Sequence, residues 1–170
     1  MSLVGPISSV AVAGVVVLFY IVSTATSHWV VTSTTSTGLW ESCWGIVCGP
    51  LPDDLLTGYV KAARGLMLLA VIVAGISWIL ALVALIGKVT GKTKHLLCTK
   101  RFLTINALTF CATGLLVLIG TSVYAVEAMK DCGDDCSFGY SIILAWVSIP
   151  LGVVAAAMLT YFFRAMCDDA

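Results

Sequence analysis

The chain has 170 residues, of which 60% are hydrophobic and 11% are charged, and its mean hydropathy is +1.07. A soluble domain carries far more charge, so this composition excludes a soluble domain and predicts an integral membrane protein. The formal net charge is zero, which excludes nucleic acid and other polyanions as expected partners.

The first predicted element is a membrane-spanning helix over residues 7–26. No Asp, Glu, Lys or Arg occurs from Met1 to Trp40, and the span is dense in Val, Ala, Ile and Leu. Pro6 stands near the helix start, where its missing N–H costs nothing. A cleaved signal peptide is the competing interpretation. The length of the run and the lack of a basic segment before it favour a retained span.

The first loop, residues 27–64, contains a cysteine pair, Cys43 and Cys48. A disulfide between them persists only in an oxidising compartment, so this loop is predicted to lie outside the cytosol. The spacing suits a β-hairpin with Gly45 in its turn. The alternatives are a metal site and free thiols. Zinc sites usually have four ligands, and no nearby His or Cys supplies the others, so the disulfide is favoured.

The segments on either side of this hairpin have different compositions. Residues 30–37 are rich in β-branched residues and Ser, which favours one extended strand. Asp53 and Asp54 follow the hairpin and suit the first turn of a helix. Arg64 ends the loop at the membrane face, where a long basic side chain reaches the headgroups.

Two further spans are predicted, over residues 65–86 and 102–126, because neither stretch contains a charged residue. The loop between them, residues 87–101, has no acidic residue. Its basic residues and histidine are Lys88, Lys92, Lys94, His95, Lys100 and Arg101. The positive-inside rule therefore places this loop in the cytoplasm.

The second outside loop, residues 127–140, is acidic and contains Cys132 and Cys136. Four outside cysteines allow three pairings, of which Cys43 with Cys48 and Cys132 with Cys136 is favoured. A calcium site is the alternative use of the acidic residues, but their spacing does not match a known calcium loop. The fourth span covers residues 141–163, and residues 164–170 form a tail. Both termini are therefore predicted to be cytoplasmic.

The chemistry of the spans argues against two classes of function. No Asp, Glu, Lys, Arg or His lies at membrane depth, where a coupled transporter usually has one. No nucleophile elbow or phosphate loop occurs, so an enzyme is rejected and no cofactor or metal is expected. Asn106 is the strongly polar side chain within a span, and we expect it to hydrogen-bond between helices. Cys98 and Cys167, near the inner face, are candidates for reversible palmitoylation.

Small residues recur at four-residue spacing in three spans. The pairs are Ser9 with Ala13, Ala70 with Ala74, and Gly152 with Ala156. Such pairs let helices approach closely, so they predict that the four spans pack into one left-handed bundle. Lateral self-association is the alternative use of the same pattern.

Several residues of the first loop form a known pattern, namely Trp29, Gly38, Leu39, Trp40, Cys43 and Cys48. This pattern resembles the Trp...Gly-Leu-Trp...Cys...Cys signature of the claudin, peripheral myelin protein, epithelial membrane protein and lens fibre membrane protein superfamily. Residues 61–67, which include Arg64, are similar to the start of the second claudin helix. Residues 140–147 are similar to the start of the fourth helix in the myelin and epithelial branch.

The resemblance implies a fold. The chain is expected to be an all-α membrane protein, in which a left-handed four-helix transmembrane bundle is topped by a small extracellular antiparallel β-sheet. The first loop supplies most of the sheet, and a strand near the second loop completes it. Leu39 and Trp40 are expected to seat the sheet on the membrane end of the bundle.

The resemblance also implies a function without catalysis, in the plasma membrane at cell–cell contacts. The expected roles are adhesion, a tight-junction-type barrier or a paracellular channel. The expected partners, besides the lipid bilayer, are lateral copies of the chain and a like protein on an apposed cell. Asp53 and Asp54 fall where claudins carry charge-selecting residues, and in a narrow path their carboxylates would favour cations. The alternative role is an auxiliary subunit of an ion channel.

Overall fold

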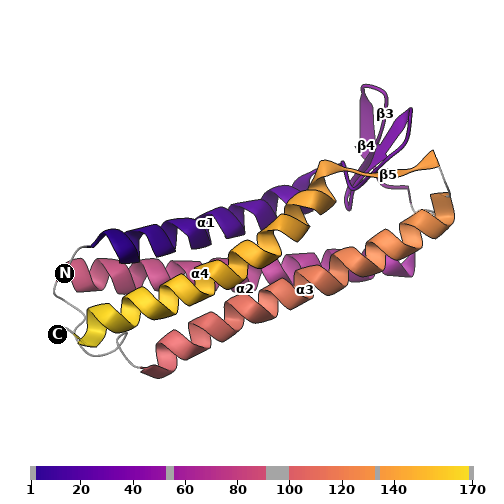
Figure 1. Ribbon diagram of the computed structural model, residues 1–170. Coiled ribbons are helices and arrows are strands. Elements are labelled where there is room, and N and C mark those ends of the chain that lie inside the picture. Colours follow the sequence, from indigo (N-terminus) through magenta and orange to yellow (C-terminus); the bar gives the residue numbers. More distant parts are fainter. Residues whose placement is uncertain (1–2, 53–55, 91–99, 133–134, 169–170) are drawn as a thin grey trace.

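Four helices form the body of the protein in a computed structural model, which describes residues 3–52, 56–90, 100–132 and 135–168, with side chains for 3–52, 56–90, 104–132 and 135–165. The helices are α1 (Val4–Ala25), α2 (Gly58–Val89), α3 (Lys100–Cys132) and α4 (Tyr140–Asp168). They run side by side, with both chain termini at one end and a small sheet at the other (Figure 1). Each helix contains a segment long and apolar enough to cross a membrane, which confirms the predicted four spans.

Helix α2 begins well before the span predicted over residues 65–86. It starts at Gly58, so Lys61 and Arg64 are already helical. The reason is that an uncharged run marks the part of a helix that suits lipid, whereas backbone hydrogen bonds continue into the aqueous region. Arg64 is thereby held on a rigid helix beneath the sheet.

The helices pack in a ring in which α1 contacts α2 and α4, and α3 also contacts α2 and α4. The small-residue pairs predicted from the sequence face this interior. Ser9 and Ala13 of α1, like Ala70 and Ala74 of α2, are fully buried. At Gly152 of α4, an added Cβ would lie 3.5 Å from the Tyr20 hydroxyl of α1, so the two helices are close there. Small residues therefore serve packing within the bundle.

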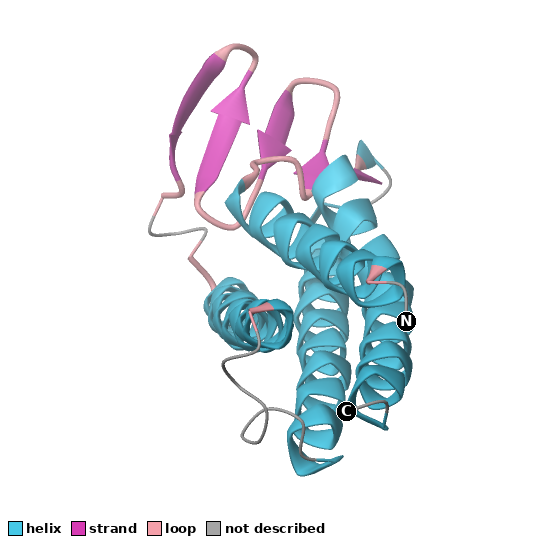
Figure 2. Cartoon of the chain, turned by 90° about the vertical axis from the view of Figure 1, so that its left-hand side faces the viewer, coloured by secondary structure: helices cyan, strands magenta, loops and turns pink. Residues whose placement is uncertain are grey.

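The sheet has five short strands, which are β1 (Val30–Val31), β2 (Thr35–Thr37), β3 (Glu41–Trp44), β4 (Val47–Pro50) and β5 (Ser137–Phe138). Their order is β4-β3-β2-β1-β5, and every pair is antiparallel. Strand β5 comes from the connection between α3 and α4, so both predicted outside loops contribute to one sheet. Seen along the helices, the sheet extends to one side of the bundle (Figure 2).

The prediction of one continuous strand over residues 30–37 is wrong, because the segment turns back on itself between β1 and β2. The Thr32 hydroxyl accepts a hydrogen bond from the backbone N–H of Thr35 at 3.0 Å. The Thr32 N–H in turn donates to the Thr35 carbonyl at 2.8 Å. A Thr side chain that bonds local backbone groups favours a turn over a longer strand.

Candidate functional site

The part of the chain that projects from the bundle is the sheet with its connecting loops, residues 28–52 and 135–139, which we call the cap. Trp29 is its anchor, since this large side chain is fully buried between the cap and the helices. Its indole N–H donates to the Ser23 carbonyl of α1 at 2.8 Å. Its ring meets that of Tyr124 on α3 edge-to-face, with the centroids 4.9 Å apart. One residue thus ties the cap to two helices.

Two further signature residues, Leu39 and Trp40, attach the cap to α1 and α2. Leu39 is fully buried, and the indole N–H of Trp40 donates to the Thr24 carbonyl at 2.9 Å. The Arg64 Nε–H donates to the Leu39 carbonyl, and the guanidinium carbon lies 4.8 Å from the centre of the Trp40 ring. The Arg64 charge is therefore used in a cation–π contact and a backbone hydrogen bond within the fold.

Two glycines allow close backbone contacts, Gly38 with the residues that directly follow α1 and Gly139 within the cap. A Cβ on Gly38 would lie 2.5 Å from the Cα of Ser27 and 2.6 Å from the carbonyl oxygen of Thr26. A Cβ on Gly139 would overlap the carbonyl group of His28. Gly139 also donates its N–H to the Trp29 carbonyl at 2.9 Å, which joins the two loops next to β5. Only glycine fits such close backbone contacts.

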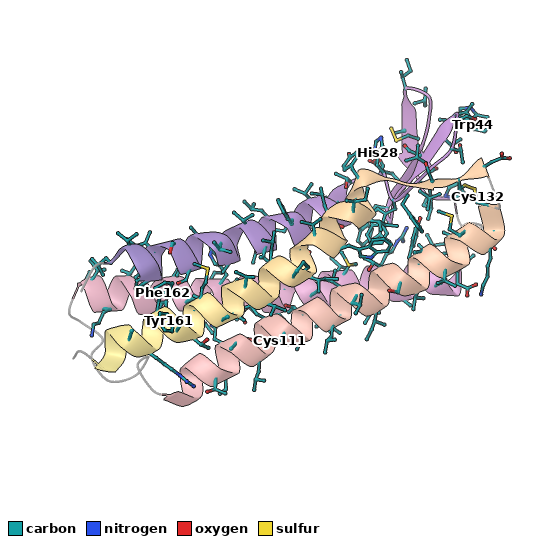
Figure 3. All side chains as sticks on the ribbon, viewed as in Figure 1. His28, Trp44, Cys111, Cys132, Tyr161 and Phe162 are labelled. Carbon is teal, nitrogen blue, oxygen red and sulfur yellow. A yellow bond between two sulfur atoms is a disulfide. The ribbon has the colours of Figure 1, made fainter. Side chains whose placement is uncertain are left out.

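Two disulfides lie at the cap (Figure 3). Cys43 and Cys48 are directly opposite each other on β3 and β4, and their bond closes the hairpin. Cys132, the last residue of α3, is bonded to Cys136, which precedes β5. Cys111 on α3 is the free cysteine among the described residues.

The β3–β4 hairpin ends in an apolar tip, residues 44–47, which we call the hairpin tip. The side chains of Trp44, Ile46 and Val47 are 75%, 100% and 71% exposed. Gly45 is first in the two-residue loop between the paired Trp44 and Val47, with a φ of 60°. A Gly with positive φ at that position is typical of a type II′ turn, which suits the twist of the two strands. The disulfide and this turn hold three apolar side chains away from the core.

Ile46 and Val47 are not among the site residues predicted from the sequence. The signal that identifies them is the pairing itself. Once Cys43 and Cys48 are opposite each other and Gly45 begins a two-residue loop, Ile46 must lie at the end of the hairpin, beyond any core.

Beneath the sheet a cavity of about 220 Å³ lies between the cap and helices α2 and α3. At its rim the Tyr59 hydroxyl of α2 donates to the Asp131 carboxylate of α3 at 2.9 Å. Burial, and then this hydrogen bond, raise the pKa of Tyr59 above its ordinary value. The neutral phenol therefore remains the donor across the ordinary pH range and links the two helices below the cap.

Three of the predicted site residues, Asp53, Asp54 and Cys98, lie outside the described residues. Cys167 lies in α4, beyond the last described side chain at residue 165. Within the described ranges no group of three His, Cys, Asp or Glu side chains gathers as a metal site would require. Among the described residues, the structure brings together the contacts that attach the cap to the helices and an exposed apolar hairpin tip.

The sequence is similar to known proteins along nearly its whole length. A model described as the PMP-22/EMP/MP20/Claudin family matches residues 2–159. Over 140 residues the chain is 29% identical to epithelial membrane protein 1 of Homo sapiens, covering 81% of this chain and 82% of that protein. It is 31% identical to epithelial membrane protein 1 of Oryctolagus cuniculus, over 92% of this chain and 94% of that protein. It is 32% identical to claudin-11 of Homo sapiens, over 82% of this chain and 74% of that protein.

The family match and the four apolar helices agree with the signature read from the first loop. Proteins of this family are structural membrane proteins and not enzymes, so the rejection of an enzyme is confirmed. The chain therefore belongs to the PMP-22/EMP/MP20/Claudin family and is a claudin-like tetraspan membrane protein.

Proposed function

We propose that this protein acts at cell–cell contacts in the plasma membrane, where its cap touches a like protein on the apposed cell and its helices associate laterally. The observation that carries the proposal is the hairpin tip, which holds exposed Trp and aliphatic side chains on a rigid support. Exposed apolar patches of this kind on a surface that faces water mark interaction sites. The similarity to a claudin supports an adhesive or barrier-forming contact.

The proposed function needs the cap to lie outside the cell, and the distribution of basic residues supports this orientation. The loop over residues 87–101 is basic and free of acidic residues, which favours the cytoplasmic side for that end of the bundle. The cap is at the opposite end, where its two disulfides suit an oxidising space. Both chain termini are then cytoplasmic, and the hairpin tip is outside the cell.

The test is expression of the full chain in cells that lack contact proteins, followed by aggregation assays and freeze-fracture imaging. Wild-type protein is expected to concentrate at cell contacts. A variant with Trp44→Ser, Ile46→Ser and Val47→Thr is expected to reach the surface normally and to lose most of the aggregation, because the apolar contact is gone.

The matched control is Ser33→Ala with Thr34→Ala, which changes two exposed polar residues of the neighbouring β1–β2 turn and should leave aggregation unchanged. If the hairpin-tip variant aggregates as much as the wild type, the hairpin tip does not make the cell–cell contact. A diffuse distribution of the wild type, together with altered currents of a co-expressed channel, would instead favour the auxiliary-subunit role.

Cation selection by Asp53 and Asp54 is a finer proposal. If the first loop lines a paracellular path, their two carboxylates attract sodium and repel chloride. Replacing both with Asn is expected to reduce the preference for sodium over chloride across a cell layer. Unchanged selectivity in such a layer, with normal protein at the contacts, would remove this proposal.

A further inference from the structure

The cavity beneath the sheet has a chemistry that the proposed contact function does not use. It measures about 220 Å³, and Cys132, labelled in Figure 3, is one of its lining residues. Pockets that enclose a drug-sized ligand measure roughly 300–1,000 Å³, so this cavity suits a small chemical group and not a whole lipid or peptide. Among its lining residues Asp131 is exposed, and Tyr59 and Cys132 are half-buried. The mouth of the cavity therefore lies between the cap-side ends of α2 and α3.

This mouth lies at the depth of the lipid headgroups. Tyr59 precedes the uncharged span that begins at Gly65 by six positions, about 9 Å along α2. Asp131 follows the span that ends at Val126 by five positions, about 8 Å along α3. The headgroup layer on each side of a bilayer is roughly 5–8 Å thick. A lipid headgroup in the leaflet on the cap side therefore reaches the cavity without leaving the membrane.

The mouth carries a negative charge that the described residues do not neutralise. The Asp131 carboxylate accepts a hydrogen bond from the Tyr59 hydroxyl at 2.9 Å and makes no salt bridge with any described residue. Lys130, its neighbour in the sequence, is paired with Glu127 at 2.7 Å. No Lys or Arg is among the described residues that line the cavity. A carboxylate in this position favours a positively charged ligand and disfavours a phosphate.

The walls restrict which cation fits. Tyr59 of α2 and Tyr124 of α3 both line the cavity, with their ring centres 5.9 Å apart and their planes at 70°. The buried side chains of Val30, Leu51 and Val60 line it as well. A metal ion or a primary ammonium is strongly hydrated, so it would lose water against aliphatic walls. A quaternary ammonium has no N–H to satisfy, packs its methyl groups against such walls, and is attracted by aromatic rings.

We propose that this cavity binds the choline group of a phospholipid in the leaflet on the cap side. The trimethylammonium group lies beside the Asp131 carboxylate and against the rings of Tyr59 and Tyr124. The lipid phosphate stays outside the cavity, where water solvates it, and the acyl chains remain in the bilayer beside α2 and α3. This site uses none of the hairpin-tip side chains and does not depend on the proposed contact function.

The experiment is native mass spectrometry of the full chain released from nanodiscs. The nanodiscs contain equal amounts of phosphatidylcholine and phosphatidylethanolamine with the same acyl chains, so the two lipids differ only in the three methyl groups on nitrogen. Retained phosphatidylcholine is expected to exceed retained phosphatidylethanolamine about threefold to tenfold. Excess tetramethylammonium chloride should abolish this preference, and sodium chloride at the same concentration should not. Equal retention of the two lipids, or equal effects of the two salts, would overturn the proposal.

Variants at the mouth separate the local charge from the general charge of this end of the bundle. Asp131→Asn removes the unpaired carboxylate from an exposed position, so the protein should fold and lose the preference for phosphatidylcholine. Glu127→Gln is the matched control, because it removes the same charge one turn earlier on α3 from a residue that does not line the cavity. Loss of the preference in both variants, or in neither, would contradict a site at Asp131.

Variants of Tyr59 test the aromatic wall. Tyr59→Phe keeps the ring and removes the hydrogen bond to Asp131, so the preference for phosphatidylcholine should remain. Tyr59→Leu removes the ring and should reduce the preference severalfold. Thermal unfolding of both variants shows whether each is folded. If Tyr59→Phe lost the preference as fully as Tyr59→Leu while both stayed folded, the ring would not be a binding wall.

Discussion

At Gly139 the chain passes so close to the backbone just before β1 that even a methyl group would overlap the His28 carbonyl. Gly139→Ala is therefore expected to push β5 away from β1 and to destabilise the cap by roughly 1–3 kcal/mol, the usual cost of overpacking. The measurement is thermal unfolding of the purified protein together with the fraction that reaches the cell surface.

The matched control for Gly139→Ala is Gly49→Ala in β4. A Cβ at Gly49 has no atom within 4 Å and the residue is not in the left-handed region, so this substitution should be nearly neutral. If Gly139→Ala were as stable as Gly49→Ala, the close backbone contact would not matter for the cap.

The β3–β4 hairpin is the element whose local stability depends most directly on covalent chemistry. The Cys43–Cys48 disulfide closes a short loop, which is worth about 2 kcal/mol in the chain-entropy model. Cys43→Ser with Cys48→Ser is expected to speed amide hydrogen exchange in β3 and β4 while leaving the buried parts of the helices protected. Cys111→Ser should change neither, since Cys111 is a free thiol on α3.

The elements differ in how well the sequence predicted them. The helices were predictable because each span has its own uncharged apolar run, and the cysteine spacing predicted the hairpin. Strand β5 has only two residues, Ser137 and Phe138, and no periodicity, so only the family resemblance pointed to it. The turn at Thr32 was missed because β-branched composition does not show where side-chain hydrogen bonds to the backbone reverse the chain.

The candidate site was predictable in part for a related reason. Trp29, Leu39 and Trp40 belong to a recognisable pattern, whereas their partners lie elsewhere along the chain. Tyr124 meets Trp29 only because α3 packs beside the cap, and sequence spacing gives no sign of that contact. Asn106 Oδ1 has no hydrogen-bond donor among the described residues, and this too was hidden, because a single sequence does not reveal which half of an amide finds a partner.

For the whole molecule, the main expectation is the orientation of the bundle in the membrane. In a background with Ser in place of Cys98, Cys111 and Cys167, a membrane-impermeant maleimide should label Thr34→Cys on intact cells. Thr90→Cys, at the other end of the bundle, should be labelled only after permeabilisation, because the basic loop that follows it is predicted to be cytoplasmic. The opposite pattern would place the cap in the cytosol and refute the proposed function.

The position of β5 has a consequence for biosynthesis. Ser137 pairs beside Val31, which was synthesised 106 positions earlier. While the ribosome is still making α2 and α3, the nascent first loop has an open strand edge at β1, and such an edge readily pairs with other chains. Its proper neighbour arrives only with the last loop. A defect in the segment that contains β5 therefore leaves the edge of β1 unpaired. Chaperones that bind exposed strand edges would then recognise the first loop, although the defect lies in the last one.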